Sequence, residues 1–166
     1  MNAENLWLRA SGHRDHGKHP ARNPQHFFVR CAMSRSGYTD DCDDNLALGR
    51  WRAQVNSAIR GQRGQAFLRE LINVLDAMPE KELIAEELVT EDGQVCAIGA
   101  VCKARGIDVS GVDYGSPEDV ASKVGIARQM VAEIEYENDE GGWKETDEQR
   151  WQRMRRWAEG CLLKST

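Results

Sequence analysis

The chain has 166 residues and a net charge of −5 at pH 7, and 30% of its residues are charged. This composition argues against a helical membrane protein, because no segment approaches the roughly 18 consecutive apolar residues that a membrane span requires. The N-terminus lacks the apolar core of a secretory signal, so we expect none. The negative net charge also argues against a protein that coats nucleic acid with its whole surface. The five cysteines form no C-x-x-C pair, which favours a reduced chain with mostly buried thiols.

The character of the chain changes at Met33. Residues 1–32 contain all four histidines and carry five Lys/Arg against two Asp/Glu, a net charge of +3, without a hydrophobic period. Residues 33–166 carry seventeen Lys/Arg against twenty-five Asp/Glu, a net charge of −8. We therefore expect a basic, flexible leader over residues 1–32, followed by a single acidic helical domain over residues 33–166.

Apolar residues at helical spacing predict two helices at the start of the acidic domain. The first should end at Gly61 in a left-handed conformation, and the acidic residues 40–44 would favour its N-terminus. The second should run from residue 65 to residue 78, ahead of Pro79. Because the connector over residues 60–64 is short, we expect the two helices to form an antiparallel pair. The first apolar stripe is Leu48, Trp51, Val55, Ala58 and Ile59, and the second is Phe67, Leu68, Leu71, Ile72, Leu75 and Met78.

The middle of the chain supplies the predicted β-structure. Residues 81–87 could add a helical turn after the second helix. Asp92-Gly93 lies between two short runs that are compatible with strands, which predicts a small β-hairpin. Residues 96–105 are rich in Ala, Val, Ile and Cys, and they predict a buried helix that ends at Gly106.

Three further helices are indicated by capping residues. Ser116 can cap a short helix that begins at Pro117, and Gly125 allows a turn into another helix over residues 127–137. Thr146, with a glutamine three residues later, has the capping-box pattern and should open the last helix. The expected fold is therefore mainly α, with five or six packed helices and one small β-hairpin. The apolar face of the last helix consists of Trp151, Met154, Ala158, Cys161 and Leu162.

An acidic block over residues 133–148 is the first candidate functional feature. It contains eight acidic side chains and one lysine, a net charge of −7, with Trp143 among them. As an interface, it would receive a protein with a basic surface, and an exposed tryptophan would anchor the contact. As a purely structural feature, it would be a solvated face with the tryptophan in the core, because charge runs usually serve solubility. The candidate partner-binding residues are Glu133, Glu137, Asp139, Glu140, Trp143 and Glu145.

Residues 116–138 have the spacing of a helix-turn-helix. The second helix would expose Arg128, Gln129, Ala132 and Glu133, and the first two are residue types that read base edges in the major groove. The neighbouring acidic block would repel phosphates, so a packed helical pair without a DNA role is the favoured interpretation. A DNA-binding regulator is the alternative. The residues at the helix-turn-helix packing positions are Ala121, Gly125, Val131 and Ile134.

Other clusters have simpler explanations. Arginines alternate with Trp151 and Trp157 over residues 150–157, which could form a nucleic-acid patch but fits arginines that flank a core stripe and pair with carboxylates. The histidines of the leader match no zinc signature, and residues 40–44 lack the spacing of an EF-hand. We expect no metal and no cofactor. The sequence has no nucleophile elbow, P-loop, dinucleotide fingerprint or H-E-x-x-H motif, so we expect no catalysis. An enzyme of unrecognised type remains a further alternative.

Four segments resemble small uncharacterised proteins encoded by tailed phages and prophages. These segments are MSRSGYTDDCDD, IRGQRGQAFLRELINVLDAMPEKELIAEEL, GQVCAIGAVCKARGID and NDEGGWKETDEQRWQRMRRWAE, and the resemblance covers nearly all of residues 33–166. It implies an accessory protein of the bacterial cytoplasm that acts during infection or lysogeny. With the acidic block, it leads us to expect binding to a host bacterial protein with a basic surface, such as a component of a defence or nucleic-acid-processing complex. We expect nucleic acid as a partner only in the alternative of a DNA-binding regulator. We expect no membrane partner.

Overall fold

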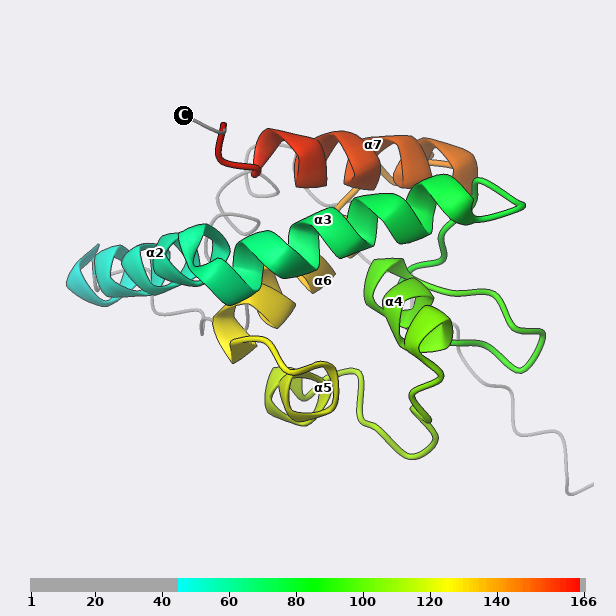
Figure 1. Cartoon of the computed structure of the whole chain (residues 1–166), viewed down its shortest axis with the longest axis horizontal. Helices are drawn as coiled ribbons and strands as arrows, with labels where there is room; N and C mark the ends of the chain where they lie inside the picture. The colour runs from blue at the N-terminus through cyan, green and yellow to red at the C-terminus, as the bar shows by residue number, and fades with distance from the viewer. Residues whose placement is uncertain (1–44, 165–166) are drawn as a thin grey trace, which may run out of the picture.

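The computed structural model describes residues 45–164, and within that range the chain forms six α-helices and no β-strand (Figure 1). The prediction of a mainly helical fold is therefore confirmed. None of these helices combines the length and the apolar composition that a membrane crossing needs. The expected flexible leader and the acidic residues 40–44 lie outside the described residues. The helices are α2 (Asn45–Arg60), α3 (Gln62–Ala77), α4 (Ala97–Arg105), α5 (Pro117–Val124), α6 (Arg128–Asp139) and α7 (Asp147–Gly160).

Helix α3 lies in the middle of the fold, with α7 along one side and α4 against another (Figure 1). Two hydrogen bonds establish that α7 runs antiparallel to α3. Trp151, near the start of α7, donates from Nε1 to the Leu75 carbonyl at 3.2 Å, whereas Gln65, near the start of α3, donates to the Cys161 carbonyl at 3.0 Å. The apolar stripe of α3 faces the core, which confirms its predicted phase. The fully buried apolar side chains of α3 are Phe67, Leu68, Leu71 and Leu75.

The junction between α2 and α3 differs from the prediction. Gly61 is the single residue between the two helices, and its backbone is extended, with φ −65° and ψ 156°, because it already caps the N-terminus of α3. One residue is too short to reverse the chain, since helical hairpins need loops of about two to five residues. Figure 1 shows α3 continuing away from α2 toward the opposite end of the molecule. The expected left-handed cap and the expected antiparallel pair are both wrong, and α7 takes the antiparallel position beside α3.

Gly64 allows the two helices to meet closely at this junction. A Cβ atom built on Gly64 would lie 2.0 Å from the carbonyl oxygen of Ala58, near the end of α2. Real Cβ contacts do not approach that distance, so any larger residue would push the helices apart. The glycine is therefore required for close packing.

The expected hairpin is reduced to one antiparallel bridge, between Val89 and Val95. The chain does reverse around Gly93, which has a φ of +82°, and Thr90 donates its N–H to the Gln94 carbonyl at 3.0 Å. Pairing ends at Cys96, because that residue is already the N-cap of α4. The turn is therefore where the sequence predicted it, but the predicted strands are reduced to a single bridge.

Residues 81–87 form no helical turn, contrary to the prediction. Their backbone groups bind other parts of the fold: the Leu83 N–H donates to the Asp147 carbonyl at 3.1 Å, and the Ile84 N–H donates to the Val95 carbonyl at 3.0 Å. The Leu83 side chain is completely buried. The segment is thus an ordered loop that is fixed by tertiary hydrogen bonds rather than by local ones.

The predicted caps are present. The Ser116 side chain accepts from the Asp119 N–H, with Pro117 following it, and Thr146 forms the reciprocal capping box with Gln149. Helix α4 ends at Gly106, as expected, and this glycine takes the left-handed conformation. These caps depend on residues within one turn of each other, which is why sequence alone could locate them.

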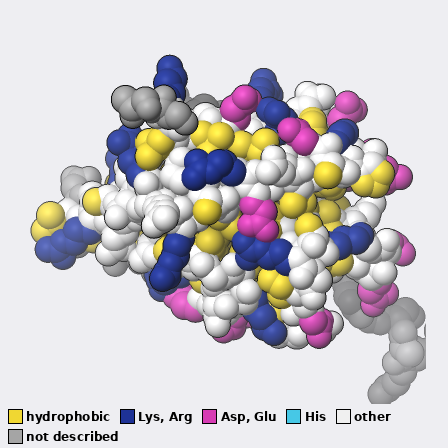
Figure 2. Space-filling model, in the orientation of Figure 1, with side chains coloured by type: hydrophobic (Ala, Val, Ile, Leu, Met, Phe, Trp, Pro, Cys, Tyr) yellow, Lys and Arg dark blue, Asp and Glu magenta, His cyan; other side chains and the backbone are white. Residues whose placement is uncertain are grey.

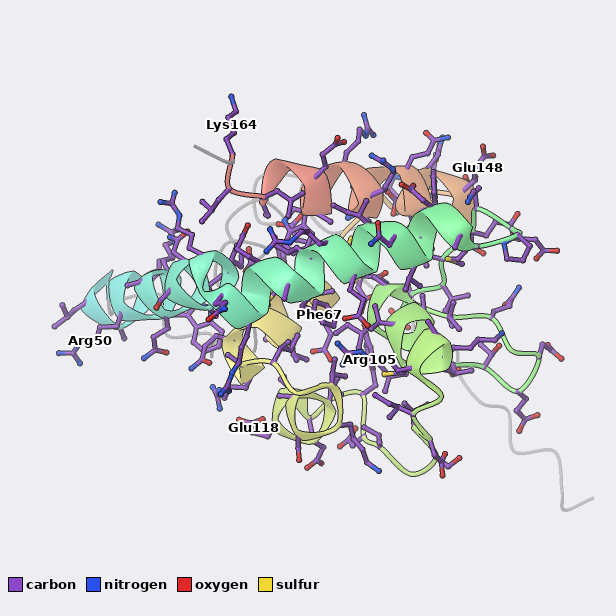
Figure 3. All side chains as sticks on the ribbon, in the orientation of Figure 1. Arg50, Phe67, Arg105, Glu118, Glu148 and Lys164 are labelled. Carbon is purple, nitrogen blue, oxygen red and sulfur yellow. The ribbon has the colours of Figure 1, made fainter. Side chains whose placement is uncertain are left out.

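Arg105 ties α4 to two other helices. Its guanidinium donates to both carboxylate oxygens of Glu70 on α3, at 2.6 and 2.7 Å, and also to the Val124 carbonyl on α5 at 2.6 Å. The same group lies over the Phe67 ring, 5.6 Å from its centroid (Figure 3). The hydrogen bonds from Arg105 hold the pKa of Glu70 below its usual value.

Candidate protein-binding site

Trp143 is the most exposed large hydrophobic residue that the structure describes, with 90% of its surface accessible. It lies in the connection between α6 and α7, after two consecutive glycines. The ammonium of the neighbouring Lys144 lies 4.4 Å from the centroid of the indole ring. The structural alternative in which this tryptophan enters the core is therefore wrong.

The base of the Trp143 loop is fixed by an ion pair from α7. Arg153 donates from Nε to Glu145 Oε1 at 2.6 Å and from Nη2 to Glu145 Oε2 at 2.7 Å. Arg150 Nε adds a longer contact to the same carboxylate at 3.6 Å. The Glu145 side chain is only 9% exposed, and the hydrogen bonds from Arg153 lower its pKa.

The same two arginines hold the end of α6. Arg150 Nε and Arg153 Nη2 both donate to the carbonyl oxygen of Asn138, each at 3.1 Å. The Glu145 N–H closes a tight turn by donating to the Gly142 carbonyl at 2.7 Å. Both ends of the loop are therefore attached to α7, and Trp143 projects between two fixed points.

Gly141 gives the Glu145 carboxylate room beneath the loop. A Cβ atom built at this position would lie 1.8 Å from Glu145 Oε2 and 2.7 Å from Arg153 Nη2. The two charged groups occupy the space that a side chain would need. A glycine is therefore part of the brace rather than a sign of looseness.

The other acidic candidates do not form the continuous surface that we expected. Glu133 is buried at 7% exposure, Glu137 is half-buried, and Glu140 is exposed. Asp139 is half-buried and accepts hydrogen bonds from Tyr114, Asn138 and the N–H of Glu86. Several members of the block are buried or bind within the fold, whereas the side chains of Glu140 and Trp143 are exposed.

Asn138 is the centre of a buried polar network that the sequence did not reveal. Its side chain accepts from the Ala97 N–H at the start of α4 at 3.1 Å and donates to the Ile84 carbonyl at 2.8 Å. Asp139 beside it accepts from the Tyr114 hydroxyl at 2.6 Å. Glu86, which donates to Asp139, has a φ of +66°, so its backbone is held in a strained conformation. The network joins α4 and α6 to the loop that precedes α4.

Glu135 lies next to this network and carries an unusual carboxyl group. Burial, followed by the charges of Asp139 and Glu118, raises the pKa of Glu135 to about 8. Its Oε1 atom is buried and has no hydrogen-bond partner among the described residues. Burial also raises the pKa of the nearby Cys96 thiol to about 12, so this sulfur is not a thiolate nucleophile at neutral pH. Within residues 45–164, no group of His, Cys, Asp and Glu side chains is arranged to hold a metal ion.

The alternative DNA-binding segment forms the predicted helical pair, with Gly125 at a φ of +79° in the turn. The expectation that Ala132 and Glu133 face solvent is wrong, because both are buried. Helix α2 supplies the cover: Trp51 and Val55 pack against Ala132 in a small cluster of their own. The face of α6 that would enter a major groove is therefore occupied.

The two proposed base-reading residues have partners within the fold. Arg128 forms an ion pair with Glu118, and its guanidinium lies over the Trp51 ring, 5.5 Å from the centroid. Gln129 donates to Gln54 of α2 at 3.3 Å. Both side chains thus help to hold α6 against α2 and α5.

Three of the four arginines over residues 150–157, namely Arg150, Arg153 and Arg155, pair with carboxylates, as the simpler interpretation predicted. Arg155 donates to both carboxylate oxygens of Asp76 and also to Glu159. Together with the Arg150 and Arg153 contacts, these pairs fasten α7 to its surroundings.

Comparison of the chain with protein-family models, with curated proteins and with solved structures gives no match.

Proposed function

We propose that this chain is a non-enzymatic protein-binding module whose contact with its partner is anchored by Trp143. The observation that carries the proposal is a tryptophan at 90% exposure on a loop that is braced on both sides. Aromatic residues of this size dominate the binding energy of many protein interfaces. An unbraced tryptophan would lose more of its conformational freedom on binding than one that the Glu145–Arg153 pair already positions.

The chemistry around Trp143 favours a particular kind of partner surface. Glu140 and Glu148 are exposed on either side of the tryptophan in sequence, and Lys144 already neutralises part of this charge. A partner would offer an apolar pocket for the indole, with basic side chains at its rim. The sequence resemblance to phage-encoded proteins suggests that this partner is a host bacterial protein, and a defence or nucleic-acid-processing complex is the type that we propose.

The DNA-binding alternative is less well supported. It requires Arg128 and Gln129 to leave their present contacts and requires α2 to expose the face of α6 that contains Ala132. The burial of Trp51 and Val55 opposes that movement. We therefore propose a protein rather than DNA as the partner.

The proposal can be tested by capture from bacterial lysate with immobilised chain, before and after nuclease treatment. If Trp143 is an interface anchor, Trp143→Ala should weaken the free energy of binding to the specific partner by at least about 2 kcal/mol. This corresponds to a rise in Kd of roughly thirtyfold. Leu46→Ala is the matched control, because Leu46 is another exposed apolar residue, on α2. Equal retention by both variants would remove Trp143 from the proposal, and loss of capture after nuclease treatment would favour a nucleic acid.

A further inference from the structure

A groove of about 700 Å³ opens between the end of α3, the side of α4 and the loop over residues 79–95. Figure 2 shows hydrophobic side chains exposed on this side of the molecule, with acidic and basic side chains around them. The volume lies within the range of about 300–1,000 Å³ that is typical of ligand sites. None of the lining residues belongs to the loop that carries Trp143, so this is a second surface. The apolar lining includes Val74, Met78, Ile84, Val95, Ala100 and Ala104.

The charged residues at the rim of the groove are predominantly acidic. Glu80, Glu82 and Asp92 are exposed, and no other described residue forms an ion pair or a side-chain hydrogen bond with them. The only basic residue in the lining is Lys103, whose ammonium donates to the Gly93 carbonyl at 2.9 Å. The rim therefore has an excess of negative charge that the fold does not neutralise.

Two further carboxylates in the lining are already neutralised. Glu70 is bound by both nitrogens of the Arg105 fork, and Asp147 accepts from Arg150 at 2.6 Å. Because these two carboxylates are paired within the fold, they differ from the three unpaired ones, Glu80, Glu82 and Asp92. The negative charge of the groove thus comes from the loop that follows α3 and from the turn at Asp92.

We propose that this acidic-rimmed groove binds an amphipathic peptide segment of a partner protein, with hydrophobic side chains in the groove and Lys or Arg at its rim. An apolar floor selects for hydrophobic side chains, and the open carboxylates select for cationic ones and repel acidic segments. A neutral apolar ligand would leave the rim charges without partners. The groove is thus a site for basic amphipathic sequences, separate from the contact at Trp143.

Fluorescence anisotropy with the full chain tests this assignment. The probe is a labelled, amidated peptide of leucine and lysine with its leucines at helical spacing, and the control peptide has glutamate in place of lysine. The lysine peptide should bind and should weaken as salt screens the rim charges, whereas the glutamate peptide should not bind. Failure of the lysine peptide to bind, or equal binding of both peptides, would overturn the proposal.

Two variants test whether the groove is the site of binding. Ala104→Phe should fill the groove without disturbing the core, because Ala104 is exposed, and the Kd of the lysine peptide should rise about tenfold or more. Ala66→Phe is the matched control, since Ala66 is exposed on α3 but does not line the groove. Identical peptide affinity in these two variants would show that the peptide binds elsewhere.

A charge variant keeps the test independent of steric effects. Glu80→Gln with Glu82→Gln should raise the Kd about threefold or more and should reduce its dependence on salt. The control pair is Glu86→Gln with Glu87→Gln, which changes the net charge equally at exposed residues outside the groove. An equal effect of both pairs would mean that the peptide senses only the overall charge, and the groove would lose its assignment. Sedimentation of the free chain completes the test: self-association that Ala104→Phe abolishes would identify a second copy as the occupant and would overturn the proposal.

Discussion

Arg153 holds the carboxylate of Glu145 with two nitrogens, Nε to Oε1 at 2.6 Å and Nη2 to Oε2 at 2.7 Å. The same guanidinium also donates to the Asn138 carbonyl at 3.1 Å. One arginine on α7 therefore fixes the last turn of α6 and the end of the loop that carries Trp143. This geometry makes the exposed tryptophan a positioned group rather than a loose one, and its removal has measurable consequences.

Glu145→Gln should destabilise the fold by about 1–3 kcal/mol, because Arg153 would lose its charge-assisted hydrogen bonds to the nearly buried carboxylate of Glu145. The measurement is the free energy of unfolding from urea titration. Glu159→Gln is the matched control, because Glu159 pairs with Arg155 on the same helix but its side chain is 63% exposed. The control should change stability by at most about 0.5 kcal/mol. A similar loss in both variants would show that the Glu145 pair is no more than a surface pair.

The lowered pKa of Glu145 gives the same pair a defined dependence on pH. A carboxyl whose pKa is lower in the folded state contributes stability above its unfolded pKa, and that contribution is lost as the pH falls through the folded value. Wild-type chain should therefore lose more stability than Glu145→Gln on acidification below about pH 4.5. Parallel unfolding curves for both proteins in acid would contradict this linkage.

Glu135 should make the stability depend on pH in the direction opposite to that of Glu145. Its pKa is about 8 in the folded chain, so the unfolded chain releases this proton at a lower pH than the folded chain does. Folding therefore takes up a proton between the ordinary pKa of 4.5 and about 8, and stability should fall as the pH rises through that interval. Glu135→Gln should remove this decrease and should be more stable than wild type at pH 8.5.

Urea titration across this pH range provides the measurement. Glu87→Gln serves as the control because Glu87 is an exposed glutamate on the loop before α4. It should retain the wild-type decrease in stability between pH 5 and pH 8. A wild-type decrease that persists unchanged in Glu135→Gln would assign it to a different group.

Gly99 should tolerate no larger residue. A Cβ atom there would lie 1.8 Å from the Leu88 carbonyl oxygen, so Gly99→Ala must move α4 or the turn that precedes it. Overpacking of this kind typically costs about 1–3 kcal/mol. Gly49→Ala is the control, since no atom lies within 4 Å of a Cβ at that position in α2. It should increase stability by about 0.5–1 kcal/mol through the helix propensity of alanine, and thermal and urea unfolding would measure both changes.

The sequence was informative where the determinants of structure are local. Ser116 and Thr146 cap helices through hydrogen bonds to residues three positions later, and the stripe of α3 follows from helical period alone. The pattern could not show that α3 begins immediately after Gly61, because a single glycine fits both a left-handed end and an extended junction. The hairpin is short because Cys96, whose N–H still donates to the Leu88 carbonyl at 3.2 Å, is also the N-cap of α4, and the helix begins at the next residue.

The candidate site was predicted in part. The exposure of Trp143 was one of two alternatives, and the pairing of the α7 arginines was anticipated. The burial of Glu133 and the cover of α6 by Trp51 were not, because both depend on α2 returning to a helix far along the chain. The role of Asn138 was also missed, since its hydrogen bonds reach Ala97 and Ile84, and no sequence motif marks such a contact.

The cover of α6 by α2 leads to the last prediction, which concerns DNA. At low salt, the full chain should show no sequence-selective binding in a gel shift, because Arg128 is paired with Glu118 and Trp51 occupies the adjacent face. Arg128→Ala should therefore leave the gel shift unchanged while removing the contacts to Glu118 and Trp51, at a cost of about 1 kcal/mol or less for an exposed pair. Arg52→Ala is the control, since it removes an exposed arginine from α2 with the same change in net charge. Selective binding that Arg128→Ala abolishes and Arg52→Ala retains would restore the DNA-binding alternative, because an equal change in net charge could not then explain the loss.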